Sequence, residues 1–294
     1  MVQLLTTQMV EIVRRRVPWR TALGAASVLV LILSSPSRGV AADSDLTGVD
    51  LCNGKDRAAP KQQIEGCTAL LKSADNPKAV AIIYNNRGNA YLATQQYDLA
   101  IKDYDEAVKS DPAYIRALNG RGVAYEKKGD YDHAIQDFTA ATKIDPNYAN
   151  AFANRAETYE KMGDYKNAAE DLNVAARLRP NLSMLQNELC WTRAMVGDLA
   201  AALANCNTAI QTTLNDATPY DSRGLVYLKM SQWDSAIADY TVALKMDPKL
   251  PSGLYGRGFA ELKKGDARDG SADIAAATAI NPKIAEEFAG YGIK

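Results

Sequence analysis

A pattern of small, aromatic and proline residues recurs in this chain every 34 residues, and no other feature limits its possible folds as strongly. Gly88, Tyr91, Ala100 and Pro112 each have a counterpart of the same type 34 positions later. The register continues without insertion through six units, which begin at Ala81, Ile115, Ala149, Ser183, Ala217 and Pro251. Repetition at such a period is typical of solenoids, because one unit cannot bury its hydrophobic face alone and has to stack on its neighbours.

Each unit contains two apolar stretches of helical period, separated by a polar turn such as "KKGD" and closed in most units by a proline. Gly129 and Gly163 can turn the chain at positive φ, and the prolines end the second stretch. If the positions of each unit are numbered from 1 to 34, small residues at positions 8, 20 and 27 allow two helices to approach closely. The sequence therefore predicts one antiparallel helix pair per unit.

With these residues the chain resembles the tetratricopeptide repeat (TPR) family, whose 34-residue pattern places Leu-Gly, tyrosine, alanine, phenylalanine and proline in the same order. The resemblance covers residues 81–284. It implies an all-α fold, a right-handed α-solenoid of stacked antiparallel helix pairs. It also implies an adaptor role, in which the first helices of the repeats line a concave groove that holds a peptide or a partner segment.

The two ends of the array are predicted to cap it, as solenoid ends require. Residues 43–80 are interpreted as a degenerate TPR-like unit, because "QQIEGCTALLKS" aligns with "LAIKDYDEAVKS" of the next repeat. Residues 285–294 are expected to form a C-terminal capping helix. Between the caps lie six predicted repeats, at 81–114, 115–148, 149–182, 183–216, 217–250 and 251–284.

Residues 1–42 have the composition of a signal peptide. The basic "RRRVPWR" precedes the apolar "ALGAASVLVLIL", and "GVAAD" offers small residues for cleavage after Ala42 or Ala41. The apolar region is too short for a bilayer, which needs about 20 residues. We therefore expect export to the periplasm or the extracellular space, with membrane contact only through this signal if it stays uncleaved.

All four cysteines lie in the part of the chain expected to be exported, which favours disulfides over metal or redox roles. Cys190 and Cys206 occupy positions 8 and 24, where other repeats place a small residue and a large one that face each other. Cys52 and Cys67 are separated by a similar interval in the degenerate unit. The predicted disulfides are Cys52–Cys67 and Cys190–Cys206, each joining two helices of one unit.

Position 7 is arginine in five of the six repeats, and position 23 is aspartate in the same five. The exceptional repeat has Leu189 and Asn205 instead, so the two positions change together. An anion-binding row of arginines is one interpretation, but an ion pair between the two helices of each repeat explains both positions. The predicted structural pairs are Arg87–Asp103, Arg121–Asp137, Arg155–Asp171, Arg223–Asp239 and Arg257–Asp273.

The chemistry expected of an enzyme or a nucleic-acid-binding protein is not evident in the sequence. The only histidine, His133, falls on a position expected to face solvent, and no phosphate-binding glycine loop or metal-spaced cluster is found. The net charge of -1 lacks the basic surplus of nucleic-acid-binding chains. We expect no catalytic activity, no cofactor, no metal and no nucleic acid, and a protein or peptide as the partner.

The resemblance also assigns the residues that would line the groove. They are Asn85, Asn89, Arg116, Asn119, Asn150, Asn154, Glu157, Trp191, Met195, Leu225, Tyr255 and Phe259. The N-terminal half of this set is amide-rich and the C-terminal half is apolar and aromatic, which is the composition of an interface core. Three alternatives remain open: some of these residues only pack between repeats, the Trp191 region binds a small ligand or glycan, or the chain is an accessory subunit of an envelope enzyme or assembly complex.

Overall fold

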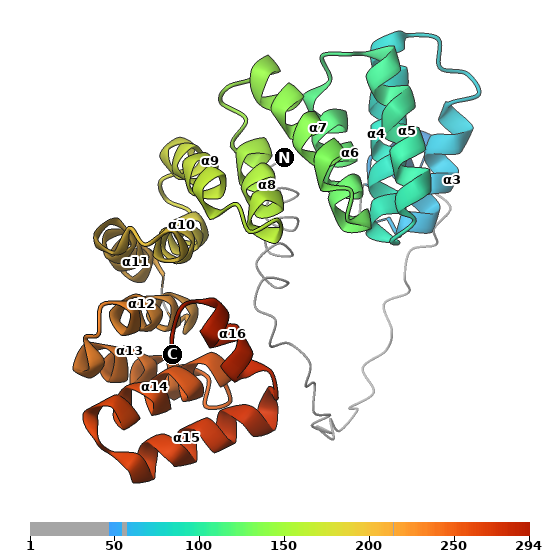
Figure 1. The fold of residues 1–294 in the computed structure, drawn as a ribbon. Coiled ribbons are helices and arrows are strands. Elements are labelled where there is room, and N and C mark those ends of the chain that lie inside the picture. Colours follow the sequence, from blue (N-terminus) through green and yellow to red (C-terminus); the bar gives the residue numbers. More distant parts are fainter. Residues whose placement is uncertain (1–46, 55–57, 214) are drawn as a thin grey trace, which may run out of the picture. The chain divides into compact units, whose positions relative to one another are not determined.

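The computed structural model describes residues 47–54, 58–213 and 215–294, so the predicted signal at 1–42 lies outside the described residues. The described chain consists of helices and their connections, without strands, as expected of an α-solenoid (Figure 1). It divides into two compact units, which among the described residues are 47–178 and 179–294 and are called the N-terminal and C-terminal units below.

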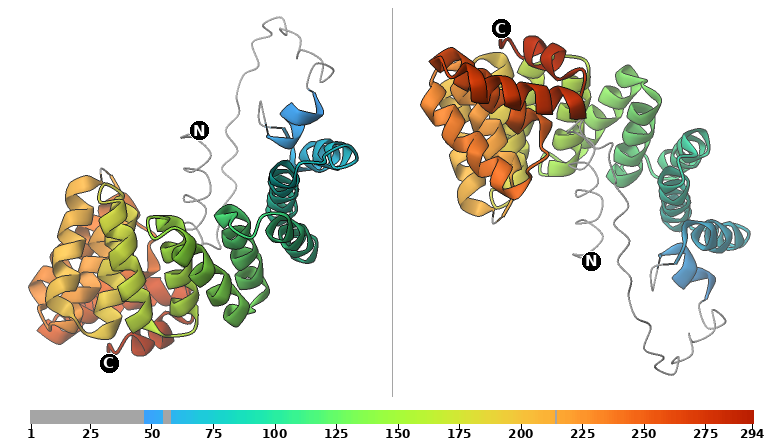
Figure 2. Two further views of the ribbon diagram at one scale, coloured as in Figure 1. Left: turned by 90° about the horizontal axis from the view of Figure 1, so that it is seen from above. Right: turned by 90° about the horizontal axis from the view of Figure 1, so that it is seen from below.

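The N-terminal unit holds eight of the described helices. They are α2 (Gly48–Cys52), α3 (Pro60–Leu70), α4 (Pro77–Ala93), α5 (Tyr97–Ser110), α6 (Ile115–Lys128), α7 (Tyr131–Ile144), α8 (Ala149–Lys161) and α9 (Tyr165–Leu178). The C-terminal unit holds seven. They are α10 (Ser183–Val196), α11 (Leu199–Thr212), α12 (Thr218–Lys229), α13 (Trp233–Met246), α14 (Pro251–Lys264), α15 (Ala267–Ile280) and α16 (Ile284–Gly290). Figure 2 shows the helix pairs of each unit from two further directions.

In several helix pairs an aromatic ring of the second helix packs directly against a glycine of the first helix. A Cβ atom added to Gly88 would come within 2.9 Å of the Tyr104 ring, and one added to Gly120 of the next repeat would come within 2.6 Å of it. Tyr104 is fully buried between the two glycines. Tyr240 lies between Gly224 and Gly256 in the same way. Glycine costs about 1 kcal/mol in a helix interior relative to alanine, and the buried ring offsets this cost.

Successive pairs stack mainly by packing the second helix of one pair against the first helix of the next, and the first helices also contact one another. In the N-terminal unit α4 contacts α6 and α6 contacts α8, whereas no comparable contact joins the second helices α5, α7 and α9 of this described stretch. In the C-terminal unit α10, α12 and α14 make the corresponding contacts. The first helices therefore form the tighter side of each stack, and the surfaces of α4, α6 and α8 and of α10, α12 and α14 are called the two inner faces below.

The helix bounds differ from the sequence expectation at the N-terminal end of the array. The first helix of the repeat predicted at 81–114 already begins at Pro77, where the Asn76 side chain accepts hydrogen bonds from the backbone N–H groups of Lys78 and Ala79. An asparagine cap followed by proline at the first helical position is a strong start signal, and it overrides the repeat register. In the degenerate unit, α2 spans only Gly48–Cys52.

None of the described helices combines the length and the hydrophobicity that crossing a membrane requires.

Candidate binding surface

The structure contains all five arginine–aspartate pairs at positions 7 and 23, and each is bidentate. The Nε and Nη2 atoms of the arginine donate to the two carboxylate oxygens over distances of 2.6 to 3.0 Å. The aspartates of four of these pairs are buried, and the side chain of the fifth, Asp273 in the last repeat, is 15% exposed. Burial raises the pKa of Asp137 and Asp171, although their arginines oppose the shift.

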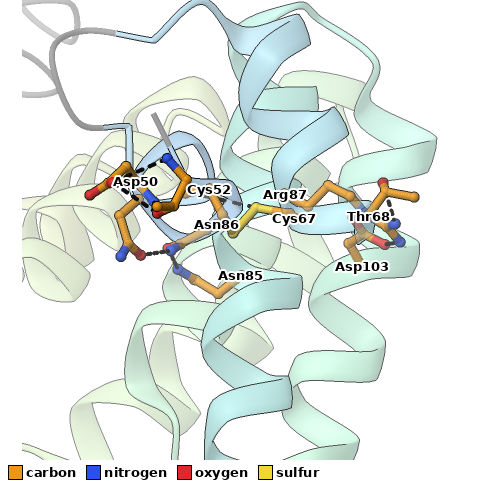
Figure 3. The surroundings of a disulfide bond; sticks show 10 residues. Asp50, Cys52, Cys67, Thr68, Asn85, Asn86, Arg87 and Asp103 are labelled. Carbon is orange, nitrogen blue, oxygen red and sulfur yellow. Dashed lines mark hydrogen bonds and ion pairs between the residues drawn. A yellow bond between two sulfur atoms is a disulfide. The ribbon is translucent and has the colours of Figure 1, made fainter. Parts of the chain in front are cut away.

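Most of these arginines also bind the preceding repeat, a contact that the sequence analysis did not predict. The Nη1 atom of Arg121 donates to Asp105 over 2.7 Å, and that of Arg223 donates to Asn207 over 2.6 Å. Arg87 reaches Thr68 of α3 in the same way (Figure 3). Each acceptor lies in the second helix of the preceding unit. The signal was available in the sequence, because a polar residue precedes Arg121 and Arg223 by 16 positions.

These guanidinium groups therefore join three helices. Their hydrogen-bonding capacity is used inside the repeat array, which favours the structural interpretation over the anion-binding one. The hydrogen bonds that Arg121 donates to Asp137 raise the pKa of Arg121, and this effect outweighs the burial that lowers it.

Both predicted disulfides are present. Cys190 and Cys206 have Cα atoms 5.2 Å apart and join α10 to α11, while Cys52 and Cys67 have Cα atoms 4.6 Å apart and join α2 to α3 (Figure 3). The repeat without the arginine–aspartate pair has a second substitute as well. Asn205 of α11 accepts a hydrogen bond from Arg193 over 2.6 Å and donates to Gln186 over 2.7 Å, so its neutral side chain connects the same two helices by hydrogen bonds.

On the N-terminal inner face the predicted asparagines bind one another. Asn154 of α8 donates to Asn119 of α6 over 2.9 Å, and Asn85 of α4 donates to its neighbour Asn86 over 3.3 Å. Asn86 in turn donates to Asn53 after α2 over 3.1 Å (Figure 3). We call Asn85, Asn86, Asn119, Asn150 and Asn154 the inner amide row.

The members of the row differ in exposure. Asn85 and Asn154 are buried, which the assignment as groove residues did not anticipate, whereas Asn119 and Asn150 are partly exposed. The Oδ1 atoms of Asn85 and Asn150 are buried and have no hydrogen-bond partner within the described part of the chain. A buried acceptor in that state costs about 1–3 kcal/mol. The side chains of the row that a ligand could reach are those of the partly exposed Asn119 and Asn150.

The other predicted residues of this face have different surroundings. Asn89 accepts a hydrogen bond from the Tyr104 hydroxyl over 2.7 Å, so its amide supports the helix pair. Arg116 is exposed. Glu157 is buried beside Lys161 at 3.1 Å, and Lys161 also contacts Glu126 of α6.

These charges form a compact network between α6 and α8. Lys127 lies 2.7 Å from Glu126 and 3.8 Å from Glu157, so two lysines compensate two buried glutamates. Burial lowers the pKa of Lys161, but the two glutamates outweigh it and the net shift is upward. Glu157 is thus part of the contact between repeats.

On the C-terminal inner face the predicted apolar residues contact the end of the chain itself. Trp191 meets Tyr291 edge to face with ring centroids 5.9 Å apart, and Tyr255 contacts Phe288 at 4.6 Å. Met195 and Phe259 pack against the same core, in which Leu225 is buried. The capping segment therefore covers residues that the sequence assigned to a partner, and the Tyr291 ring against Trp191 disfavours a sugar-stacking platform at that position.

Together these features define an α-solenoid. The positions that recur in each repeat pack the two helices of a pair together, and the inner faces carry further amide, charged and aromatic side chains. Residues 85–149 match one family model and residues 138–170 match a second, and both are described as tetratricopeptide repeat. The chain contains tetratricopeptide repeats, which the two models match over residues 85–170. No curated protein matches its sequence.

Several solved structures share this fold. YrrB, a TPR protein with an unusual peptide-binding site, is 22% identical with a TM-score of 0.58, over 66% of this chain and 98% of its own. A TPR protein from Parabacteroides merdae is 18% identical with a TM-score of 0.59, over 83% and 96%. PilF of Pseudomonas aeruginosa is 15% identical with a TM-score of 0.60, over 73% and 99%. At these identities the likeness concerns the fold.

Proposed function

We propose that this protein is a non-enzymatic scaffold that binds a protein or peptide segment on its inner faces outside the cytoplasm. TPR proteins are generally scaffolds for protein–protein interaction, and the fold match to a TPR protein with a peptide-binding site is in keeping with this role. The two disulfides favour an oxidising compartment, because thiols stay reduced in the cytosol. The signal-like composition of residues 1–42 points to the same export.

The observation that carries the proposal is the inner amide row of the N-terminal unit. Hydrogen bonds between amides orient Asn85, Asn119 and Asn154, and Asn119 and Asn150 are partly exposed on the face. An extended peptide offers backbone N–H and C=O groups at regular intervals, which amides can both accept from and donate to. Pre-oriented groups lose little rotamer freedom on binding, so each hydrogen bond contributes more to affinity.

The proposal is tested by pull-down and crosslinking from an envelope extract. Arg116→Ala combined with Asn150→Ala changes the inner face at two positions that are not fully buried. The matched control is His133→Ala with Lys143→Ala, two exposed positions on the second helix α7. We expect the inner-face variant to recover at least about five-fold less partner, since residues that matter at interfaces typically contribute more than 1 kcal/mol. Equal recovery by both variants would contradict binding at this row.

A further inference from the structure

The last residues of the chain form a defined structure. Within α16, Ile284 and Phe288 are buried while Glu286 is exposed, so the helix is amphipathic. Beyond it, Gly292 adopts φ +85°, the Gly292 N–H donates to Ala289, and the Ile293 N–H donates to Phe288. This is a Schellman motif, and its usual apolar contact is supplied by Ile293, which is 6% exposed.

Part of this segment does what a solenoid cap requires. α16 follows α15 and contacts both α14 and α15 of the last repeat (Figure 1). Ile284 and Phe288 belong to the same core as Leu254 and Ala277 of that repeat. Covering the exposed end of a repeat array needs no contact beyond the last pair.

The segment nevertheless reaches two earlier repeats on the C-terminal inner face. Tyr291 contacts Trp191 of α10, and the Lys229 ammonium of α12 donates to the Tyr291 carbonyl over 2.5 Å. Together with the contact between Phe288 and Tyr255 of α14, the segment touches the first helices of three consecutive repeats. Its aromatic side chains thereby meet residues at positions 5 and 9, two of the positions to which the family resemblance assigned the groove.

The contacts have the composition of an interface between two partners. Two aromatic rings of the segment, Phe288 and Tyr291, lie against aromatic rings of the face, and one cation binds a carbonyl at its end. Aromatic residues are enriched at the centre of interfaces, where they supply large area at low entropic cost. Burial lowers the pKa of Lys229, because the ammonium is partly shielded from water. The Tyr291 carbonyl accepts a hydrogen bond from this ammonium.

We propose that residues 284–294 are a resident ligand of the C-terminal inner face. The partner that uses this face is an amphipathic helix with apolar side chains at positions i, i+4 and i+7, the last two aromatic, and it binds by replacing the segment. The proposal rests on the proposed scaffold function and specifies the partner and the regulation of one of its faces. An apolar anchor pattern of this kind is how helices dock in grooves.

Peptide exchange tests the proposal. The probe is a fluorescein-labelled peptide with the sequence of residues 281–294, and its anisotropy is measured with the full chain and with a chain that ends at Pro282. The matched control peptide carries Phe288→Ser and Tyr291→Ser. We expect the shortened chain to bind the native peptide at least ten-fold more tightly than the full chain does, and neither chain to bind the control peptide measurably.

The shortened chain loses Ile284 and Phe288 from its core, so a second variant keeps the test decisive if circular dichroism shows that it does not fold. Tyr291→Ala in the full chain leaves both core residues in place and removes the ring against Trp191. It is expected to raise the affinity for the peptide at least three-fold over wild type. Equal affinity of wild type and Tyr291→Ala, or a folded shortened chain that binds no peptide, would overturn the proposal.

The outcome is separable from that of the scaffold function. The inner amide row belongs to the other unit, and its test uses partner recovery by Arg116→Ala with Asn150→Ala. If the peptide exchange fails but the Arg116→Ala with Asn150→Ala variant still recovers less partner than its control, only the proposal of a resident ligand is contradicted. If the inner-face variant and the control variant recover the same amount of partner, the proposed scaffold function itself is contradicted.

Discussion

At the scale of single residues, the repeat pattern explains why most of the core side chains are buried. Residues that depart from the pattern include one with a strained backbone and one whose carboxyl titrates. Position 15 adopts positive φ in every repeat, and it is glycine in four of them. Gln95 and Ser231 occupy the same position with φ of 61° and 57°. A Cβ added to Gly129 or Gly197 would meet nothing within 4 Å, so only the backbone conformation limits this position.

Ser231→Gly is therefore expected to stabilise the protein. A residue with a Cβ atom is strained by about 1–2 kcal/mol in the left-handed region, and glycine removes this strain. Glycine also gives the unfolded chain more conformational freedom, which offsets part of the gain in stability. We expect a gain of about 0.5–1 kcal/mol in the free energy of unfolding, measured by urea denaturation. The matched control, Gly197→Ala at the same position of the preceding repeat, should lose a similar amount. A destabilised Ser231→Gly would contradict this explanation.

Asp221 has a side-chain charge that depends on pH. Its Oδ1 atom is buried without a hydrogen-bond partner in the described chain, Ser252 donates to Oδ2 over 2.8 Å, and burial raises its pKa from 3.8 to about 7. Between these values the folded state binds a proton that the unfolded state has lost. The stability contributed by the protonated carboxyl is thus complete below pH 4 and is lost as the pH rises to about 7.

Asp221→Asn should remove this dependence, because the amide stays neutral and can still accept from Ser252. The variant and the wild type are expected to unfold at similar temperatures at pH 4, with the variant more stable at pH 8 by on the order of 1–3 kcal/mol. Thermal unfolding across this range provides the measurement. Parallel pH profiles of the two proteins would show that Asp221 does not titrate in the folded state.

At the scale of elements, the helix pair is the unit that the sequence specifies and the arginine at position 7 is its main polar connection. Arg121 binds Asp137 of its own repeat and Asp105 of the preceding repeat, so one side chain fixes both the pair and the stacking of pairs. The repeat with Leu189 keeps the pair together with a disulfide and the Asn205 bridge instead. Each repeat therefore has a specific connection between its two helices, and this connection is an ion pair in five repeats and a disulfide with hydrogen bonds in the remaining one.

A double-mutant cycle at Arg121 and Asp137 measures this tie. Removing either partner alone leaves a charge in a largely buried site, and we expect each single alanine variant to lose about 2–4 kcal/mol of stability. The double variant should lose less than the sum by about 1–3 kcal/mol. Lys109 and Glu106 form an exposed pair in α5, for which the coupling should be below about 0.5 kcal/mol. Additive losses at Arg121 and Asp137 would show that the pair does not act as a unit.

At the scale of the whole molecule, the chain builds two compact units from one repeat pattern, and each unit carries a disulfide. The bridges close loops of 15 and 16 residues. By loop-entropy estimates a bridge of this length contributes about 3 kcal/mol. Because such bridges persist only where the environment is oxidising, the proposed export and the stability of both units are linked.

We expect the protein purified from the envelope to have no thiol that reacts under native, unreduced conditions, and four reactive thiols after reduction and unfolding. Cys190→Ala with Cys206→Ala should lower the free energy of unfolding of the C-terminal unit by about 3 kcal/mol. Treatment of this variant with a reductant should then affect only the N-terminal unit, which serves as the internal control. Four reactive thiols in the native protein would refute both the bridges and the oxidising compartment.

The sequence by itself determined the helix pairs, their register, both disulfides and the five arginine–aspartate pairs. Each of these lies within one repeat, where a fixed number of residues through a helix, a turn and a second helix brings given positions face to face. The 34-residue period therefore carries the information.

Only the tertiary structure decided how repeats meet. It showed that Asn154 is buried against Asn119, that Arg121 also binds Asp105, and that Tyr291 reaches Trp191. The first two depend on the contact between neighbouring helix pairs, which a periodic sequence leaves open. The third concerns residues 284–294, which lie at and beyond the end of the sixth repeat, so the 34-residue pattern does not fix their position and the shape and chemistry of the face do.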